Sequence, residues 1–131
     1  MTEKAAAYVL DASAVLAWLY GEPGAGRVEA VIEASHISTV NLAEVLSKVA
    51  ERGGRARQAR LDLQSYGLRV HDFSPEQADD CAELRPLTRA WGLSLGDRAC
   101  LALSRTLRLP VLTADQAWDS VQVGVTVDLL R

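Results

Sequence analysis

Apolar and polar positions follow two patterns along the chain: short apolar runs, and longer segments with apolar residues three or four positions apart. Short runs rich in Val, Ile and Leu predict buried strands, whereas the longer spacing predicts helices. Strands are expected at 6–10, 36–40, 67–73, 109–112 and 123–129. Helices are expected at 12–20, 23–34, 41–52, 56–66, 74–91 with a kink or break at Pro86, 94–107 and 114–118. Five strands separated by helices predict an α/β fold, a three-layer α/β/α sandwich around a mostly parallel sheet of about five strands.

Composition narrows the class of protein. The 131 residues are 49% hydrophobic and 24% charged, with a formal net charge of −3, which is typical of a globular protein. The longest apolar stretch, 5–20, is interrupted by Asp11 and Ser13 and falls short of the ~20 residues of a membrane-spanning helix. No signal-peptide layout is present. We therefore expect one cytoplasmic domain over residues 1–131, with Cys81 and Cys100 as buried thiols.

Asp11 is the most informative acidic residue, because it ends the first apolar run and precedes an apolar helix. In an open α/β sheet this place is the carboxyl edge of the strands, where such folds bind ligands. Burial of a lone carboxylate is costly unless a partner compensates, and no neighbouring Lys or Arg offers itself. Asp11 therefore favours a bound cation.

Three further acids, Glu44, Asp97 and Asp115, stand at comparable places after strands or at helix starts. Four carboxylates at one edge would repel one another unless a cation held them. Oxygen ligands without a matching His or Cys set favour Mg²⁺ or Mn²⁺ over Zn²⁺. His36 and His71 lie in strand-like segments away from the acids, and we interpret both as structural.

A structural alternative stays open for three of the acids. Asn41-x-x-Glu44 and Ser94-x-x-Asp97 match the capping box, in which the third residue reaches back to the cap. Thr113-x-x-Gln116 is a third match that would leave Asp115 as a surface acid. Only Asp11 has no such explanation.

Four sequence blocks together resemble the PIN domain, and more closely the VapC-type toxins of bacterial toxin–antitoxin pairs. The blocks are 8–19 (YVLDASAVLAWL), 41–45 (NLAEV), 92–102 (GLSLGDRACLA) and 111–115 (VLTAD). They occur in order, at the spacing expected of the family, and the resemblance covers essentially the whole chain.

The resemblance implies a Mg²⁺- or Mn²⁺-dependent endoribonuclease. A water would attack an RNA phosphodiester in line, leaving a 3′ hydroxyl and a 5′ phosphate. Asp119, four residues after Asp115, is interpreted as an exposed acid, with a role through water as the alternative. The implied site residues are Asp11, Glu44, Asp97 and Asp115 as catalytic acids and metal ligands, with Ser13, Asn41 and Thr113 as supporting polar groups.

Basic residues cluster between 47 and 60, where Glu51 is the single acid. One interpretation is a solvated face. The other is a rim that contacts RNA phosphates beside the acidic centre, positioning the backbone without reading its sequence. Arg98 either extends that rim or pairs with an acid near the start of its own helix. The candidate RNA contacts are Arg52, Arg55, Arg57 and Arg60.

The resemblance also implies protein partners. The apolar helices at 12–20 and 41–52 would form a homodimer interface and a groove for the C-terminal segment of a cognate antitoxin, with a larger toxin–antitoxin assembly as a further form. Two alternatives are a PIN nuclease of RNA processing without an antitoxin, and a catalytically silent PIN-like binding module. The presence of all four acids argues against the silent module, and the chain length favours the toxin.

Overall fold

The computed structural model describes residues 6–131 and contains a five-stranded sheet in which all neighbouring strands are parallel. The strand order is β3-β2-β1-β4-β5. The predicted parallel sheet is confirmed, although only two or three residues of each run join the hydrogen-bonded ladder. The strands are β1 (Val9–Leu10), β2 (His36–Ser38), β3 (Arg69–His71), β4 (Val111–Thr113) and β5 (Val127–Leu129).

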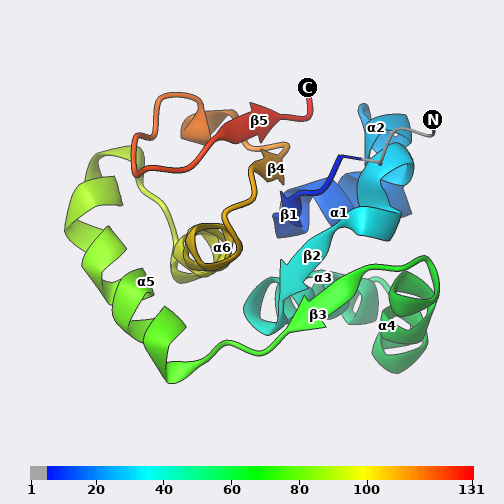
Figure 1. Ribbon diagram of the computed structural model, residues 1–131. Helices are drawn as coiled ribbons and strands as arrows, with labels where there is room; N and C mark the ends of the chain where they lie inside the picture. Colours follow the sequence, from blue (N-terminus) through cyan, green and yellow to red (C-terminus); the bar gives the residue numbers. More distant parts are fainter. Residues whose placement is uncertain (1–5) are drawn as a thin grey trace, which may run out of the picture.

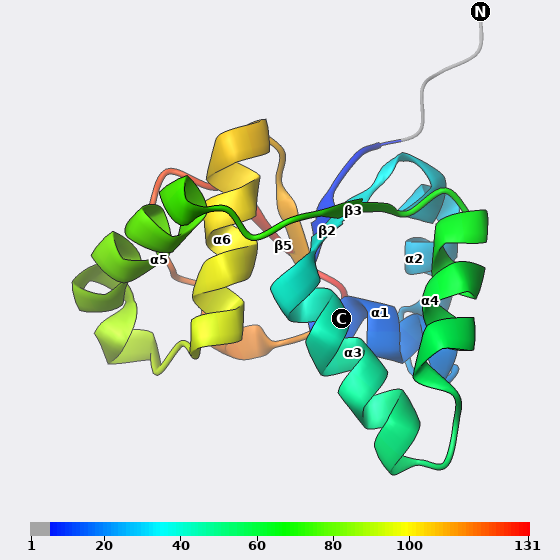
Figure 2. The same ribbon diagram turned by 90° about the horizontal axis from the view of Figure 1, so that it is seen from below.

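Helices cover both faces of the sheet, as Figures 1 and 2 show, so the α/β/α sandwich is confirmed. Helices α1 to α4 lie on one face, and α5 and α6 lie on the other. The α-helices are α1 (Ala12–Leu19), α2 (Ala25–Val31), α3 (Thr39–Glu51), α4 (Ala56–Ser65), α5 (Pro75–Thr88) and α6 (Leu95–Leu107). Three 3₁₀ turns are η1 (Ile32–Ala34), η2 (Arg89–Trp91) and η3 (Gln116–Trp118).

Two hydrophobic cores lie on opposite faces of the sheet. Leu10 and Leu112 belong to the core under α1 to α4, whereas Val9 and Val111 belong to the core under α5 and α6. Successive strand residues point to opposite faces, so a strand that is covered on both sides must be apolar throughout. This explains the uninterrupted apolar runs of β1 and β4, and Asp11 follows at the carboxyl end of β1.

The start of α3 differs from the prediction. The helix begins at Thr39, because Ser38 is its N-cap and its hydroxyl accepts the N–H of Val40 at 3.2 Å. Asn41 therefore lies inside the helix, and the proposed Asn41-x-x-Glu44 capping box is wrong. The box at α6 is confirmed: the Asp97 carboxylate accepts the N–H of Ser94 at 2.8 Å, and the Ser94 hydroxyl accepts the N–H of Asp97 at 3.2 Å.

Other boundaries were also displaced. The segment expected as one helix over 23–34 is α2 followed by η1. Helix α2 starts at Ala25, since Gly24, the N-cap, is left-handed (φ 97°). Pro86 does not interrupt α5, which continues to Thr88 before η2. Both Pro86 and Ala82, whose carbonyl loses its usual N–H donor, are exposed, so solvent can satisfy that carbonyl.

No helix within residues 6–131 is both long and apolar enough to cross a membrane. Cys81 and Cys100 are buried free thiols, as predicted.

Candidate active site at the carboxyl edge of the sheet

Asp11 lies directly after β1 at the N-cap position of α1, where its side chain makes no capping hydrogen bond, and only 4% of its surface is exposed. Its N–H continues the ladder to the carbonyl of Leu112 at 3.1 Å, and its carbonyl accepts the N–H of Ala14 at 3.0 Å. The backbone is thus fixed between the neighbouring strand and the helix that follows. The predicted burial of this carboxylate at the edge of the sheet is confirmed.

Two hydroxyl groups hold the Asp11 carboxylate. Ser13 Oγ donates to Oδ2 at 2.7 Å, and Thr113 Oγ1 donates to the same oxygen at 3.0 Å. Each hydroxyl also accepts a backbone N–H from the segment after β4: Ser13 from Ala114 at 2.9 Å, and Thr113 from Asp115 at 3.0 Å. Donor and acceptor capacity are both used, so the orientation of Asp11 is set by the pairing of β1 with β4.

The Thr113-x-x-Gln116 capping box is wrong for the same reason. The Thr113 hydroxyl is committed to Asp11, and Asp115 itself caps η3, its Oδ1 accepting the N–H of Ala117 at 2.9 Å. The expected helix over 114–118 is only this short 3₁₀ turn. Asp115 is an exposed acid that is nonetheless fixed in place beside Thr113.

Glu44 reaches the site from the second turn of α3, across to the start of α6. The Asn41 amide nitrogen donates to Glu44 Oε1 at 2.9 Å and to the carbonyl of Gly96 at 2.9 Å. Asn41 is fully buried, and its Oδ1 atom has no hydrogen-bond partner. Asn41 therefore joins α3 to α6 and leaves one buried carbonyl oxygen available beside the acids.

Burial and mutual repulsion act on three of these acids. Burial is the main cause that raises the pKa of Asp11, Glu44 and Asp97. The charge of Asp97 raises the pKa of Asp11 and of Glu44, and Asp115 raises the pKa of Asp97, which Arg98 offsets in part. Each acid thus feels at least one of the others across the edge of the sheet.

The charges of these acids are compensated by neutral hydrogen-bond donors and not by ion pairs. The ion pairs formed within residues 6–131 join other acids, such as Asp80 to Arg105 at 3.4 Å. The thiol of Cys100 lies beneath the cluster, and burial followed by the charges of Asp11, Asp97 and Glu44 raises its pKa well above the ordinary value. The region therefore carries a concentrated negative charge.

The residues fit a hard divalent cation. Over the described part of the chain, no three His, Cys, Asp or Glu side chains form a ready metal cage. Mg²⁺ does not require one, because it is held through one or two carboxylates and keeps several waters. The carboxylates that repel one another, and the unpartnered Asn41 oxygen, are the oxygen donors that such an ion selects.

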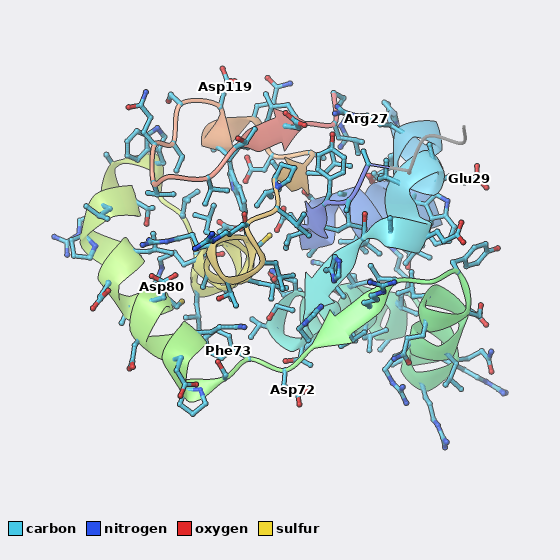
Figure 3. All side chains as sticks on the ribbon, viewed as in Figure 1. Arg27, Glu29, Asp72, Phe73, Asp80 and Asp119 are labelled. Carbon is cyan, nitrogen blue, oxygen red and sulfur yellow. The ribbon has the colours of Figure 1, made fainter. Side chains whose placement is uncertain are left out.

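The structure does not bring every candidate into this site. His36 and His71 contact each other on β2 and β3, with Nδ1 and Nε2 2.8 Å apart. Asp119 lies on the outer surface after η3 (Figure 3). Arg98 neither extends the basic rim nor forms an ion pair with an acid: its Nη1 donates to the carbonyl of Cys81 at 2.9 Å.

The basic cluster begins at the far end of α3. Arg52 stacks on the ring of Tyr20, with the guanidinium carbon 3.8 Å from the ring centre, and Arg60 bonds Gln64 on α4. Arg55 and Arg57 are exposed. Arg52 lies eight residues after Glu44, which at 1.5 Å per helical residue is about 12 Å along α3. Arg52 therefore lies outside the immediate contacts of the acids.

A groove of about 480 Å³ lies between α1, α3 and α4. Trp18 and Tyr66 contact edge to face in its wall, with ring centres 4.9 Å apart, and Val49 and Leu63 add apolar surface. Tyr66 is 52% exposed. The expected groove involved the helices at 12–20 and 41–52; this one is lined by α1, α3 and also by α4, which was not part of that expectation.

Gly96 is a site residue that the sequence patterns did not single out. The only signal is a glycine in the first turn of a helix, where it is unfavourable compared with alanine.

The chain is similar in sequence to a known protein family over most of its length. Residues 8–124 match the family model of the PIN domain. VapC ribonuclease Mb0640 of Mycobacterium bovis and ribonuclease VapC30 of Mycobacterium tuberculosis are each 32% identical over 114 residues, which cover 79% of this chain and 86% of the relative.

Solved structures share the fold. A toxin–antitoxin complex from Klebsiella pneumoniae superposes with a TM-score of 0.76 at 19% identity, covering 95% of this chain and 98% of the other. VapC20 of Mycobacterium tuberculosis, described as a Sarcin-Ricin loop cleaving toxin, gives 0.70 at 18% identity, covering 91% and 98%. With the sequence relatives, these matches show that the chain belongs to the PIN-domain family and, within it, to the VapC ribonucleases.

Proposed function

We propose that the chain is the toxin of a type II toxin–antitoxin pair, a single PIN domain that hydrolyses RNA phosphodiester bonds with Mg²⁺ or Mn²⁺. The observation that carries this proposal is the buried Asp11 carboxylate, which two hydroxyls hold in place and which no cationic side chain neutralises. A purely structural acid at this depth would be expected to have a charged partner.

The four acids have distinct tasks in this proposal. Asp11, the most buried, is the preferred direct ligand. Asp97 is close enough for its charge to raise the pKa of Asp11, and burial raises its own pKa. Glu44 and Asp115 would bind the ion directly or through water. The bound ion would supply a Lewis acid, which lowers the pKa of a water and offsets the charge of the phosphate. No histidine base is then needed, in agreement with the position of His36 and His71.

The remaining residues bind and orient. Ser13, Thr113 and Asn41 hold the carboxylates, so little reorganisation is needed when the phosphate arrives. Arg52, Arg55, Arg57 and Arg60 would contact the RNA backbone, because an acidic centre cannot attract RNA unaided.

The groove between α1, α3 and α4 would receive a cognate antitoxin. Relatives of the same fold are solved as toxin–antitoxin complexes, among them VapBC2 of Rickettsia felis bound to a DNA fragment from its promoter. The apolar walls at Trp18, Leu63 and Tyr66 suit a segment with apolar anchors. We also propose a homodimer, a larger toxin–antitoxin assembly, and a cytoplasmic location.

The test is cleavage of a structured RNA by the purified protein. With Mg²⁺ or Mn²⁺ we expect cleavage, which excess EDTA or the substitution Asp11→Asn or Asp97→Asn abolishes. Asp79→Asn, at an exposed position on α5, is the matched control and should cleave normally. Cleavage that survives both EDTA and Asp11→Asn would refute the metal site.

Expression in a bacterial host separates the toxin from the alternatives. We expect growth arrest, relieved by the product of the adjacent gene. An active nuclease without toxicity would indicate RNA processing, and RNA binding without cleavage would indicate the binding module.

A further inference from the structure

The first turn of α6 has an open space at Gly96, and the Glu44 carboxylate occupies it. A Cβ atom built on Gly96 would lie 2.7 Å from Cδ of Glu44 and 2.9 Å from Oε2, and closer still to Oε1. All three distances are shorter than a nonbonded contact permits. Glu44 can keep its present position only because residue 96 has no side chain.

Asn41, on α3, stabilises the contact between Glu44 and Gly96. Its amide nitrogen bonds both the Glu44 carboxylate and the carbonyl of Gly96, each at 2.9 Å, and its side chain is fully buried. The carboxylate therefore lies against the backbone of α6, one residue before Asp97. The Glu44 side chain has no other hydrogen-bond partner among the described residues.

We propose that Gly96 is a positioning residue whose missing side chain seats Glu44 against α6, within reach of Asp11 and Asp97. This inference rests on the proposed function and adds to it a determinant of the nuclease geometry that is not itself an acid. Glu44 comes from α3 and the other acids come from β1, α6 and the end of β4. The hydrogen bond from Asn41 to the Gly96 carbonyl joins α3 to α6 at this point.

Gly96→Ala should lower the activity without lowering the stability. The atoms that a new methyl group would meet belong to the end of a flexible side chain, so Glu44 can swing away while the backbone stays in place. Gly96 is not in the left-handed region, and alanine favours a helix more than glycine does. We therefore expect unchanged or higher stability together with a loss of activity. If Gly96 were needed only for packing, the substitution would lower both the stability and the activity.

Gly26→Ala is the matched control. Gly26 is also the second residue of a helix, α2, and a Cβ there would meet nothing within 4 Å. Thermal unfolding in EDTA should show that neither substitution lowers the midpoint. In NMR spectra of the metal-free protein, the side-chain amide signals of Asn41 should move only in Gly96→Ala. RNA cleavage by Gly96→Ala should fall by about 100-fold, the loss typical of a 1 Å misplacement, whereas Gly26→Ala should cleave normally.

A double-mutant cycle tests the mechanism. Glu44→Asp shortens the acid, so its carboxylate no longer reaches the space beside Gly96. Gly96→Ala should then cost much less activity in the Glu44→Asp background than in the wild-type background, because interacting sites are not additive. Equal losses in both backgrounds would overturn the proposal.

The outcomes separate this inference from the proposed function. If the wild type cleaves RNA and Asp11→Asn does not, a fully active Gly96→Ala with unmoved Asn41 signals overturns the inference alone. If the wild type cleaves no RNA, the proposed function fails, and the Asn41 signals still decide whether Gly96 seats Glu44. A lowered unfolding midpoint for Gly96→Ala, with Gly26→Ala unchanged, would also overturn the inference.

Discussion

Replacing Asp11 by asparagine should stabilise the metal-free protein while abolishing its activity. The side chain is 4% exposed and has no cationic partner. A buried ion in a protein costs several kcal/mol after relaxation, and the charge of Asp97 adds to that cost. An amide has nearly the same shape, removes the charge, and keeps one oxygen to accept the hydroxyls of Ser13 and Thr113.

The magnitude follows from these opposing contributions. A hydrogen bond to a charged group contributes about 1.5–3 kcal/mol and one between neutral groups about 0.5–1.5 kcal/mol, so the two hydroxyl bonds together weaken by about 2–3 kcal/mol. Relief of the burial cost exceeds this loss, and we expect a net gain of about 1–3 kcal/mol in the free energy of unfolding. For a chain of this size each kcal/mol raises the melting temperature by about 4 °C.

Thermal unfolding with and without Mg²⁺ measures both effects. In EDTA, Asp11→Asn should melt above the wild type, and the exposed control Asp79→Asn should match the wild type. Mg²⁺ at ten times its dissociation constant should raise the unfolding free energy of the wild type by about 1.4 kcal/mol, and that of Asp11→Asn by much less. An Asp11→Asn protein that melts far below the wild type in EDTA would refute the reasoning, because the carboxylate would then be a net stabilising group.

The burial of Asp11 also makes the free energy of unfolding depend on pH. The pKa of Asp11 is raised above its ordinary value of 3.8 in the folded state, chiefly by burial. The folded protein then binds more protons than the unfolded chain between the ordinary and the raised pKa, so this contribution to stability rises as the pH falls through that window. At pH values above the raised pKa, Asp11 is charged in the folded protein and destabilises it fully. Asp11→Asn should remove this part of the pH profile in EDTA, and an unchanged profile would contradict the assignment.

Three further predictions concern the groups around the acids. Thr113→Val removes a donor to Asp11 and leaves the N–H of Asp115 without its partner; urea unfolding should show a loss of about 1–3 kcal/mol, and unchanged stability would contradict the hydroxyl's role. Arg55→Glu combined with Arg57→Glu should raise KM for RNA and flatten its salt dependence while kcat stays constant; an unchanged KM would assign these arginines to a solvated face. Ala59→Arg fills the groove and should prevent inhibition by the antitoxin while cleavage continues; retained inhibition would exclude this groove as the docking site.

Elements were predictable from the sequence wherever one physical signal dominated. A strand covered on both faces must be apolar, so β1 and β4 could be recognised from their runs of Val and Leu. Helix starts were less certain where two capping residues stand close together. Ser38 and Asn41 are both residue types that favour the N-cap position. Which of them caps α3 depends on where β2 stops pairing with β1 and β3. That pairing is a tertiary property that local sequence does not contain.

The sequence was sufficient to predict which acids belong to the candidate site. It was not sufficient to predict the contacts that hold them. Asp11 could be placed at the edge of the sheet because it follows a buried strand. Its hydrogen bond with Thr113 spans 102 positions and depends on β1 lying beside β4. Contact between Glu44 and Gly96 likewise needs α3 packed against α6. Both contacts come from strand order and helix packing, which no single motif specifies.

Neutral groups around the acids are consistent with the proposed metal site. Arginine or lysine beside Asp11 would relieve repulsion among the carboxylates, but its charge would take the place of the cation that the site is to bind. Hydroxyl and amide donors from Ser13, Thr113 and Asn41 orient the oxygens and leave their negative charge in place. The folded protein without metal is therefore less stable than its packing alone would make it. That unrelieved repulsion is also the physical reason for the divalent cation that we propose at this edge of the sheet.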